Sequence, residues 1–299
     1  MTLTMAQRDE LAQHFESHRP RLRAIAYRML GSLSDADDAV QEAWLRLSRV
    51  DASEIENLGA WLTTVVARIS LNLLRARKAR REEPLEVRLP EPIVDGAGGM
   101  DPEHEVLLGD AVGLALLVVL DELSPAERLS FVLHDMFAVP FDEIAAISGR
   151  SPDAARQLAS RARRRVRGSA PPPDADLAAQ REVIAAFEAA AREGDFEALL
   201  GVLDPDVVLR ADSEGGGGGA PVTVRGAEAV ASRAAMYSRL RLDQRPVLVN
   251  GAAGVLVLRD GEPFALMAIG VRAGKVSQLD IVANPARLQA MDLKPLTRS

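Results

Sequence analysis

The sequence of 299 residues contains no cysteine, which excludes disulfide bonds, thiolate metal sites and cysteine nucleophiles. Long apolar runs are also missing, since the longest, Ala111 to Leu120, is far shorter than the ~18 residues of a membrane span. The first thirty residues carry Arg8 and Glu16 and no apolar segment of the kind found in signal peptides. We therefore expect a soluble, cytoplasmic protein with no membrane partner, no cofactor and no bound metal.

Positive charge is in short supply as well, because 36 Lys and Arg oppose 43 Asp and Glu and leave a net charge of −7. This balance argues against a nucleic-acid partner, which normally needs a surplus of basic residues. The average hides two basic clusters, five residues within 75–81 and six within 156–167. Apolar residues make up 47% of the chain, enough for packed cores in two or three domains. Nucleic-acid binding therefore stays open at two local sites.

Two segments rich in proline, glycine and acid predict linkers that separate three modules. The linkers are 82–102 and 169–176, and the modules are 5–81, 103–168 and 177–290, followed by a tail at 291–299. The first two modules have helical periodicity, whereas the third starts with an amphipathic helix and continues with β-branched runs. The helix is expected at 177–192, and strands at 207–209, 247–249, 255–258, 264–271 and 275–283. The expected fold class is multidomain, with two all-α modules followed by an α+β domain.

One helix of the first module, predicted at 35–47 with Ser34 as its N-cap, has two different faces. At 100° per residue, an apolar face packs inward and an acidic face lies opposite. The apolar face comprises Ala36, Val40, Ala43, Trp44 and Leu47, and the acidic face comprises Asp35, Asp38, Gln41 and Glu42. A solvated surface is the simpler explanation of the acidic face when it is taken alone.

The next helix, predicted at 59–81, carries a polar row opposite its apolar stripe. The row comprises Thr64, Arg68, Asn72 and Arg75, and the basic residues Arg77, Lys78, Arg80 and Arg81 continue from its C-terminal end. Cations at that end complement the helix dipole, which accounts for one or two of them without nucleic acid. Arginine and asparagine offer paired hydrogen bonds in fixed geometry, so the row is suited to contact phosphates and base edges.

The strongest local pattern is a pair of helices around Gly149. A short amphipathic helix from Phe141 meets Gly149, which is suited to a left-handed turn. A second helix opens with Ser151 as its N-cap and Pro152 at its first position, a spacing typical of a helix-turn-helix. Its exposed face comprises Asp153, Arg156, Gln157, Ser160, Arg163, Arg164 and Arg167. The alternative is a helical hairpin with a basic solvated face.

These two helical modules resemble the promoter-binding domains of bacterial extracytoplasmic-function sigma factors. Residues 35–44 are similar to the core-polymerase-binding segment of sigma region 2, and residues 60–75 are similar to its minus-ten-recognising helix. Residues 120–128, with the helix-turn-helix that follows them, resemble sigma region 4. The order and spacing of the three blocks make the resemblance specific.

The resemblance implies core RNA polymerase and promoter DNA as partners. It implies that region 4 meets the flap region, and that region 2 docks on the clamp helices of the largest polymerase subunit through Asp38, Gln41 and Glu42. The implied minus-ten contacts are Arg68, Asn72, Arg75 and Arg77. The implied minus-thirty-five contacts are Arg156, Gln157, Ser160, Arg161 and Arg164. Several of these side chains, Arg68 and Asn72 among them, differ from those common in the family, so the promoter sequence does not transfer.

The third module resembles a SnoaL-like domain, a curved sheet wrapped by helices around a pocket, and the whole chain resembles the sigma-J type that carries such a domain. The marks of that type are Leu89, Pro90, Glu91 and Pro92 in the linker, Asp212 before a glycine run, and Asn284, Pro285 and Leu288 near the end. The glycine run, Gly215–Gly219, is longer than usual and lacks the expected basic residue after it. The resemblance implies intramolecular contact between the C-terminal domain and the sigma modules, which tunes promoter binding.

An enzyme and a ligand-sensing regulator are the competing interpretations. SnoaL-like isomerases and cyclases use a pocket Asp, His or Tyr as acid or base. The third module has no histidine, and Tyr237 is its one tyrosine. The remaining acids are Asp204, Asp206, Asp212 and Asp280, of which Asp206 and Asp280 are equally well explained as solvated groups at strand ends. We expect a sigma factor with no catalytic residues, with a ligand-sensing helix-turn-helix regulator as the alternative and an isomerase or cyclase as a more remote one.

Overall fold

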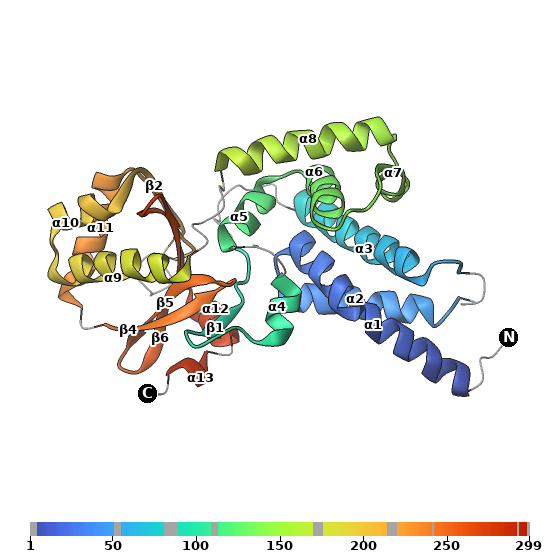
Figure 1. The fold of residues 1–299 in the computed structure, drawn as a ribbon, viewed down its shortest axis with the longest axis horizontal. Helices are drawn as coiled ribbons and strands as arrows, with labels where there is room; N and C mark the ends of the chain where they lie inside the picture. Colours follow the sequence, from blue (N-terminus) through green and yellow to red (C-terminus); the bar gives the residue numbers. More distant parts are fainter. Residues whose placement is uncertain are drawn as a thin grey trace. The chain divides into compact units, whose positions relative to one another are not determined.

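A computed structural model describes residues 5–50, 55–80, 89–108, 113–169, 176–213, 220–240, 242–291 and 293–297. Arg81, residues 82–88 and 170–175 of the two predicted linkers, and the glycine run Gly215–Gly219 lie outside the described residues. The chain divides into two compact units (Figure 1). Unit 1 comprises 1–83, 102–109 and 116–171, and unit 2 comprises 84–101, 110–115 and 172–299.

Unit 1 is helical throughout the part of it that the structure describes, which confirms the all-α expectation for both modules. Its elements are α1 (Met5–Leu30), α2 (Leu33–Leu47), α3 (Leu58–Arg80), α4 (Pro102–Leu108), α5 (Leu114–Glu122), α6 (Pro125–Phe131), a π-helix (Val132–Met136), α7 (Phe141–Ser148) and α8 (Pro152–Ser169). The first two residues of α5 belong to unit 2. None of the described helices is long and apolar enough to span a lipid bilayer.

The first three helices of unit 1 share one core because each of them buries an apolar stripe. Phe15 and Leu22 of α1 are fully buried together with Leu47 of α2 and Leu62 of α3. The Phe15 ring also contacts Trp44 of α2, with the ring centroids 5.0 Å apart. The apolar face predicted for the helix at 35–47 is therefore the packed face, and Asp38 and Gln41 of the opposite face are exposed.

The start of α2 differs from the prediction. Ser32 has an extended backbone, and its Oγ accepts a hydrogen bond from the Asp35 amide at 3.4 Å. The helix begins at Leu33, so Ser34 lies inside its first turn and the prediction of Ser34 as the N-cap is wrong. The reason lies just upstream, because Gly31 ends α1 with a φ of +69° and leaves Ser32 as the first residue that can cap the next helix.

The predicted helix-turn-helix is confirmed in its details. Gly149 follows α7 with φ 71° and ψ 36°, and its amide donates to the carbonyl of Ala145 at 3.0 Å. Ser151 Oγ accepts the Ala154 amide at 3.2 Å, and α8 begins at Pro152. Residue chemistry alone fixes this turn, since glycine enters the left-handed region without steric cost and serine satisfies a free amide of the first turn.

Unit 2 is built on a sheet that has seven strands in its described part, in the order β1-β4-β5-β6-β7-β2-β3. The strands are β1 (Val94–Gly96), β2 (Leu203–Ala211), β3 (Val222–Arg225), β4 (Asp243–Val249), β5 (Ala252–Arg259), β6 (Glu262–Arg272) and β7 (Lys275–Val282). Neighbouring strands are antiparallel except β2 and β7, which are parallel. The helices are α9 (Leu177–Glu193), α10 (Phe196–Val202), α11 (Ala227–Met236), α12 (Pro285–Ala290) and α13 (Lys294–Thr297), with a 3-10 turn at Tyr237–Arg239.

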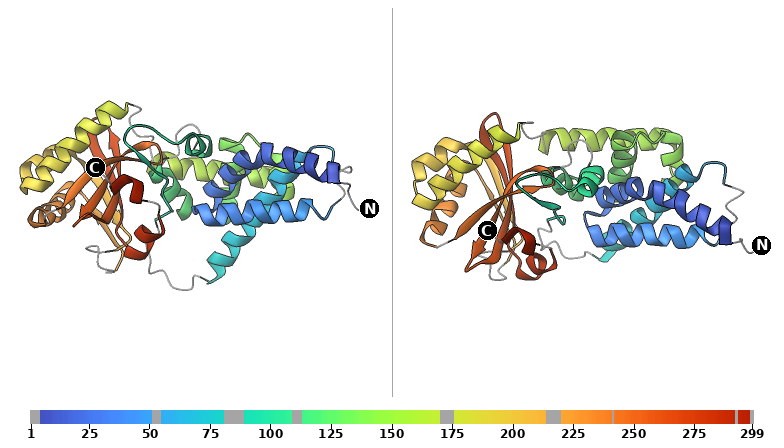
Figure 2. Two further views of the ribbon diagram at one scale, coloured as in Figure 1. Left: turned by 90° about the horizontal axis from the view of Figure 1, so that it is seen from below. Right: turned by 60° about the horizontal axis from the view of Figure 1, so that its bottom comes forward.

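The core of unit 2 lies between one face of the sheet and the helices α9, α10 and α11 (Figure 2). Ile184 and Phe187 of α9 and Val230 of α11 share this core with Val255 and Leu279 of the sheet. The α+β class, the first helix and all five predicted strands are thereby confirmed.

Two strands escaped prediction because they are short. β1 lies inside the segment 82–102, whose proline and glycine content indicated a linker, yet its Val94 pairs with Val249 of β4. β3 has only four residues, and it pairs with the end of β2, where Val222 faces Ala211. Strands of three or four residues carry too little alternation to stand out from a loop.

Candidate nucleic-acid interface and linker latch

The acidic side of α2 is only partly available to a partner. Asp38 and Gln41 are exposed, whereas Glu42 is half-buried and accepts a hydrogen bond from Arg46 Nε at 2.8 Å. Asp37 on the same helix pairs with Arg23 of α1, with Nε and Oδ1 2.6 Å apart. The three residues predicted to contact polymerase therefore lie on one accessible surface, beside an acid that is already neutralised within unit 1.

The polar row of α3 lies against the helix-turn-helix. Arg68 and Arg75 donate from Nη2 to the carbonyls of Ala146 at 3.1 Å and Ser148 at 3.5 Å, at the C-terminal end of α7. The last carbonyls of a helix lack partners within the helix and carry partial negative charge, so guanidinium groups are favourable there. Two of the predicted minus-ten contacts, Arg68 and Arg75, are therefore bonded to α7. That helix belongs to the module that is predicted to bind the minus-thirty-five element.

The other two members of the predicted minus-ten set differ from each other. Asn72 is exposed. Arg77 is half-buried, and its Nη1 donates to the carbonyl of Leu30 at 3.2 Å while its Nη2 donates to Asp35 Oδ2 at 2.5 Å. Arg77 therefore ties α3 to the junction of α1 and α2.

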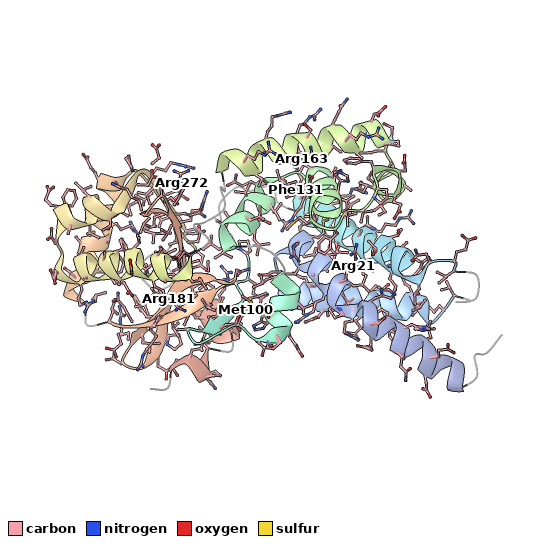
Figure 3. All side chains as sticks on the ribbon, in the orientation of Figure 1. Arg21, Met100, Phe131, Arg163, Arg181 and Arg272 are labelled. Atoms are coloured by element: carbon pink, nitrogen blue, oxygen red, sulfur yellow. The ribbon has the colours of Figure 1, made fainter. Side chains whose placement is uncertain are left out.

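The exposed face of α8 stays largely open. Arg156, Gln157, Arg161 and Arg164 are exposed and Ser160 is half-buried, so the predicted minus-thirty-five set shares one accessible surface. Its contacts include the bond from Arg164 Nη1 to Ser160 Oγ at 3.3 Å, and Arg156 Cζ lies 5.6 Å from the ring centroid of Phe141 in α7. Arg163, which is labelled in Figure 3, instead bonds Asp135 at 2.7 Å. Arg165 lies 3.5 Å from Glu127. Neighbouring arginines of α8 thus divide between an outward-facing surface and internal ion pairs.

Two buried arginines that the sequence analysis missed join α1 to the later helices. Arg28 of α1 donates to the carbonyls of Ala24, Leu107 and Leu108. Arg128 of α6, only 1% exposed, donates from Nε to the carbonyl of Arg28 at 3.0 Å and from Nη1 to Asp121 at 3.0 Å.

The charge of Arg28 survives its burial. Burial lowers the pKa of Arg28 to about 10, which still leaves the guanidinium protonated near neutral pH. Three carbonyl acceptors and the Phe137 ring, 5.0 Å from its Cζ, surround that charge. One signal was available in the sequence, because Arg28 interrupts an otherwise apolar stretch of α1.

In unit 2, the predicted linker motif is held by a single arginine. Arg287 donates from Nη2 to the carbonyls of Leu89 at 2.8 Å and Pro90 at 3.0 Å, and from Nη1 to Asp212 Oδ2 at 2.6 Å. The other carboxylate oxygen of Asp212 accepts the amides of Ala283 at 2.8 Å and Asn284 at 3.0 Å. We call Asp212, Arg287 and the two carbonyls that Arg287 holds the linker latch.

The remaining residues of the predicted regulatory set surround the latch. Leu89, Pro90 and Pro92 are buried and Glu91 is half-buried. Asn284 caps α12 with its side-chain oxygen, Pro285 begins that helix and Leu288 is buried beneath it. Arg287 itself was not among the predicted residues, although it lies within the same motif.

The segment after the latch is part of the sheet. The Ile93 amide donates to Asn250 Oδ1 at 3.0 Å, and the Asn250 amide donates to the carbonyl of Ile93 at 2.8 Å. Further along, Arg181 of α9 donates to the carbonyl of Ala97 at 2.8 Å. Residues 89–97 are thus bound to the rest of unit 2 by the latch, by the pairing of β1 with β4 and by α9.

The acids of unit 2 occupy different environments. Asp206 is exposed, as expected for a solvated strand end. The same expectation for Asp280 is wrong, because Asp280 is 2% exposed, lies 3.5 Å from Arg210 and accepts a hydrogen bond from Gln278 at 2.5 Å. Burial raises the pKa of Asp280 to about 6, and the two partners offset the shift only in part. Its neighbours on β7, not Asp280, line the cavity described next.

A cavity of about 120 Å³ lies within unit 2. Its polar lining residues are Ser213, Arg233, Tyr237 and Gln244, and the remaining described lining residues are apolar. No histidine or acidic side chain belongs to that described lining, so the acid or base expected of a SnoaL-like enzyme would have to be Tyr237.

Comparison with known proteins accounts for both units. The family model for sigma-70 region 2 matches residues 14–80, and the model for sigma-70 region 4 matches residues 113–166. The ECF RNA polymerase sigma factor SigJ of Mycobacterium tuberculosis is 40% identical, in an alignment that covers 94% of each chain. The probable ECF RNA polymerase sigma factor SigI of the same species is 34% identical, over 96% of this chain and 98% of that protein.

A solved structure agrees with these sequence matches. The crystal structure of Mycobacterium tuberculosis SigJ superposes with a TM-score of 0.72 and 36% identity, and the match covers 94% of this chain and 99% of that one. The likeness therefore extends through the helical modules and the C-terminal sheet domain together.

Proposed function

This chain belongs to the extracytoplasmic-function (ECF) RNA polymerase sigma factors, and we propose that it divides promoter recognition between two helical modules under the control of its own sheet domain. It recognises promoters as a subunit of RNA polymerase. The single observation that supports this most is the order of the matches, with region 2, region 4 and a sheet domain present in one chain over almost the full length of a relative. We assign region 2 to 5–81, region 4 to 103–168 and the regulatory domain to 177–290, with linkers at 82–102 and 169–176 and a tail at 291–299.

The proposed polymerase contact is the accessible surface of α2. Asp38, Gln41 and Glu42 would dock on the clamp helices of the largest subunit, and region 4 would dock on the flap region. A pull-down of core RNA polymerase by the full-length chain tests the first contact. Replacing Asp38 and Glu42 together by Ala is expected to weaken recovery, whereas Asp37→Ala is a matched control because its carboxylate is already paired with Arg23. Equal recovery by both variants would contradict this contact.

The proposed minus-thirty-five contacts are on α8, where an arginine pair offers a sharp test. Arg164 faces outward, whereas the adjacent Arg163 is bound to Asp135. Arg164→Gln should weaken promoter binding by the holoenzyme at least about fivefold, the lower end for a lost base contact, and Arg163→Gln should leave it nearly unchanged. Sequencing of the DNA recovered with polymerase would give the promoter, and equal losses in both variants would contradict the assignment.

The proposed minus-ten contacts compete with contacts inside unit 1. Arg68 and Arg75 are exposed, but each donates to a carbonyl at the end of α7, so promoter DNA would compete with α7 for both guanidinium groups. Core polymerase would favour DNA in that competition. The free chain is therefore expected to bind promoter DNA weakly, and strong binding in the absence of polymerase would favour a freestanding helix-turn-helix regulator.

The proposed regulation acts through the number of residues between α3 and the segment that unit 2 holds. With residues 89–97 held on unit 2, only the eight residues 81–88 join α3 to the held segment. Eight residues reach at most about 29 Å when fully extended, so release of the latch would lengthen the reach between regions 2 and 4. In transcription assays with core enzyme, a latch variant is expected to change promoter choice or activity, and wild-type behaviour would contradict this mode of control.

A further inference from the structure

The cavity of unit 2 has the composition of a binding site for a small apolar molecule. Phe187 of α9, Leu209 of β2, Phe264 of β6 and Ile281 of β7 contribute to its walls. Its volume of about 120 Å³ is slightly below the ~150 Å³ of an apolar cavity that holds one benzene ring. The space therefore suits a body of about six non-hydrogen atoms.

Ser213 distinguishes this cavity from a packing defect. The residue lies in the lining, two positions after the end of β2, and is 2% exposed. Its Oγ has no hydrogen-bond partner among the residues that the structure describes. A buried hydroxyl without a hydrogen-bond partner costs roughly 1–3 kcal/mol, so such a group normally bonds to protein, water or a ligand. A serine hydroxyl turns between three rotamers and can donate or accept.

We propose that this cavity binds a small uncharged compound whose apolar, ring-sized body fills the space and whose single hydrogen-bonding group pairs with Ser213 Oγ. A cation is disfavoured because the described lining has no acid, and most of its residues are apolar. An anion is not required either, because Arg233, the one basic residue of that lining, already interacts with another group of the protein. Phenol has the required size and one hydroxyl, which makes it a suitable probe. Benzene offers the same ring without the hydroxyl, and benzylamine offers a cationic group instead.

Residues of the cavity lining are adjacent in sequence to residues of the linker latch. Asp212 precedes Ser213, and its carboxylate holds Arg287 of the latch. Ala283, whose amide donates to Asp212, also lies in the cavity lining. If the latch acts as proposed above, an occupied cavity would alter the hold on the linker, and this step rests on that proposed function. Binding itself does not depend on it.

Calorimetric titration of the full-length protein tests the proposal. Phenol should bind saturably and roughly tenfold more tightly than benzene, because one hydrogen bond distinguishes them, and benzylamine should not bind. Ser213→Ala should reduce phenol binding to the level of benzene. Ser277→Ala is the matched control, since Ser277 lies outside the lining and its Oγ already donates to the Gly270 carbonyl at 3.2 Å.

Filling the cavity gives a second, independent test. Ala191 of α9 is half-buried in the lining, so Ala191→Leu should abolish binding of both phenol and benzene. Ala234→Leu of α11 serves the same purpose if the first variant does not fold, as judged by circular dichroism. The proposal is overturned if neither probe binds the wild type saturably, or if Ser213→Ala binds phenol as the wild type does. Binding without any effect on transcription would overturn only the coupling to the latch.

Discussion

Replacing Arg287 by Gln is the most direct perturbation of the linker latch, because one side chain makes all three of its contacts. The variant would leave the carbonyls of Leu89 and Pro90 without their donor. It would also leave the Asp212 carboxylate, whose side chain is 5% exposed, with two backbone amides as its remaining partners. The loss is therefore larger than that of a surface ion pair.

The expected cost follows from the two hydrogen bonds that the variant removes from the linker, those from the Arg287 guanidinium to the carbonyls of Leu89 and Pro90. A hydrogen bond to a charged group contributes ~1.5–3 kcal/mol. The Arg287 side chain is 27% exposed, so water recovers part of this and the expected cost is about 2–3 kcal/mol. The variant lowers the free energy of local opening of residues 89–97 by this amount. The hydrogen bonds that report this opening are those of the Ile93 amide to Asn250 and of the Asn250 amide to Ile93. Exchange of those amides should accelerate roughly 30- to 150-fold.

Hydrogen exchange followed by mass spectrometry of the full-length chain measures this effect. Arg272→Gln is the matched control, because Arg272, which is labelled in Figure 3, has a side chain that is 46% exposed and lies 3.0 Å from Asp204. A surface pair of that kind contributes ~0–1 kcal/mol, so the control should change exchange in 89–97 little. If peptides from 89–97 exchange no faster in Arg287→Gln than in Arg272→Gln, the latch does not hold the linker and the reasoning fails.

Two further predictions concern Gly149 and Asp280. Gly149→Ala should lower the unfolding free energy by about 1 kcal/mol, since the φ of Gly149 is +71°. Gly168→Ala within α8 should be neutral or stabilising, and thermal unfolding of the two variants measures the difference. Burial raises the pKa of Asp280 from 3.8 to about 6, so the folded chain binds this proton more tightly than the unfolded chain. Stability should therefore fall by about 3 kcal/mol as pH rises from about 4 to about 6, and denaturant titrations should show no such decline in Asp280→Asn. A parallel decline in both proteins would contradict the Asp280 prediction.

Features that depend on neighbours in the chain could be predicted from the sequence. The turn at Gly149, the Ser151 cap and the start of α8 at Pro152 rest on conformational preferences of single residues, and each is as predicted. The five strands follow from β-branched runs in the same way. The cap of α2 shows the limit, because Ser32 and Ser34 are both competent caps, and only the position at which α1 ends selects Ser32.

Features that depend on distant residues could not be predicted. Arg28 meets carbonyls 79 and 80 residues away, and Arg287 meets a carbonyl 198 residues away. No local pattern encodes such pairs, although an arginine within an apolar stretch is a signal that it will be buried with acceptors. Asp280 was misjudged for the same reason, since its burial depends on how strands far apart in the sequence are brought together.

The net charge of −7 bears on how the free chain interacts with DNA. Arg75 and Arg77 of the first basic cluster bond to groups within unit 1, as does Arg68 earlier on α3, whereas Lys78 is exposed. The outward face of α8 is the other basic surface described, within a chain of opposite overall charge. Phosphate binding scales with the number of available cations, so the free chain should be a poor DNA ligand. Polymerase binding would then act as the switch, because it would release Arg68 and Arg75 from the α7 carbonyls when a promoter is within reach.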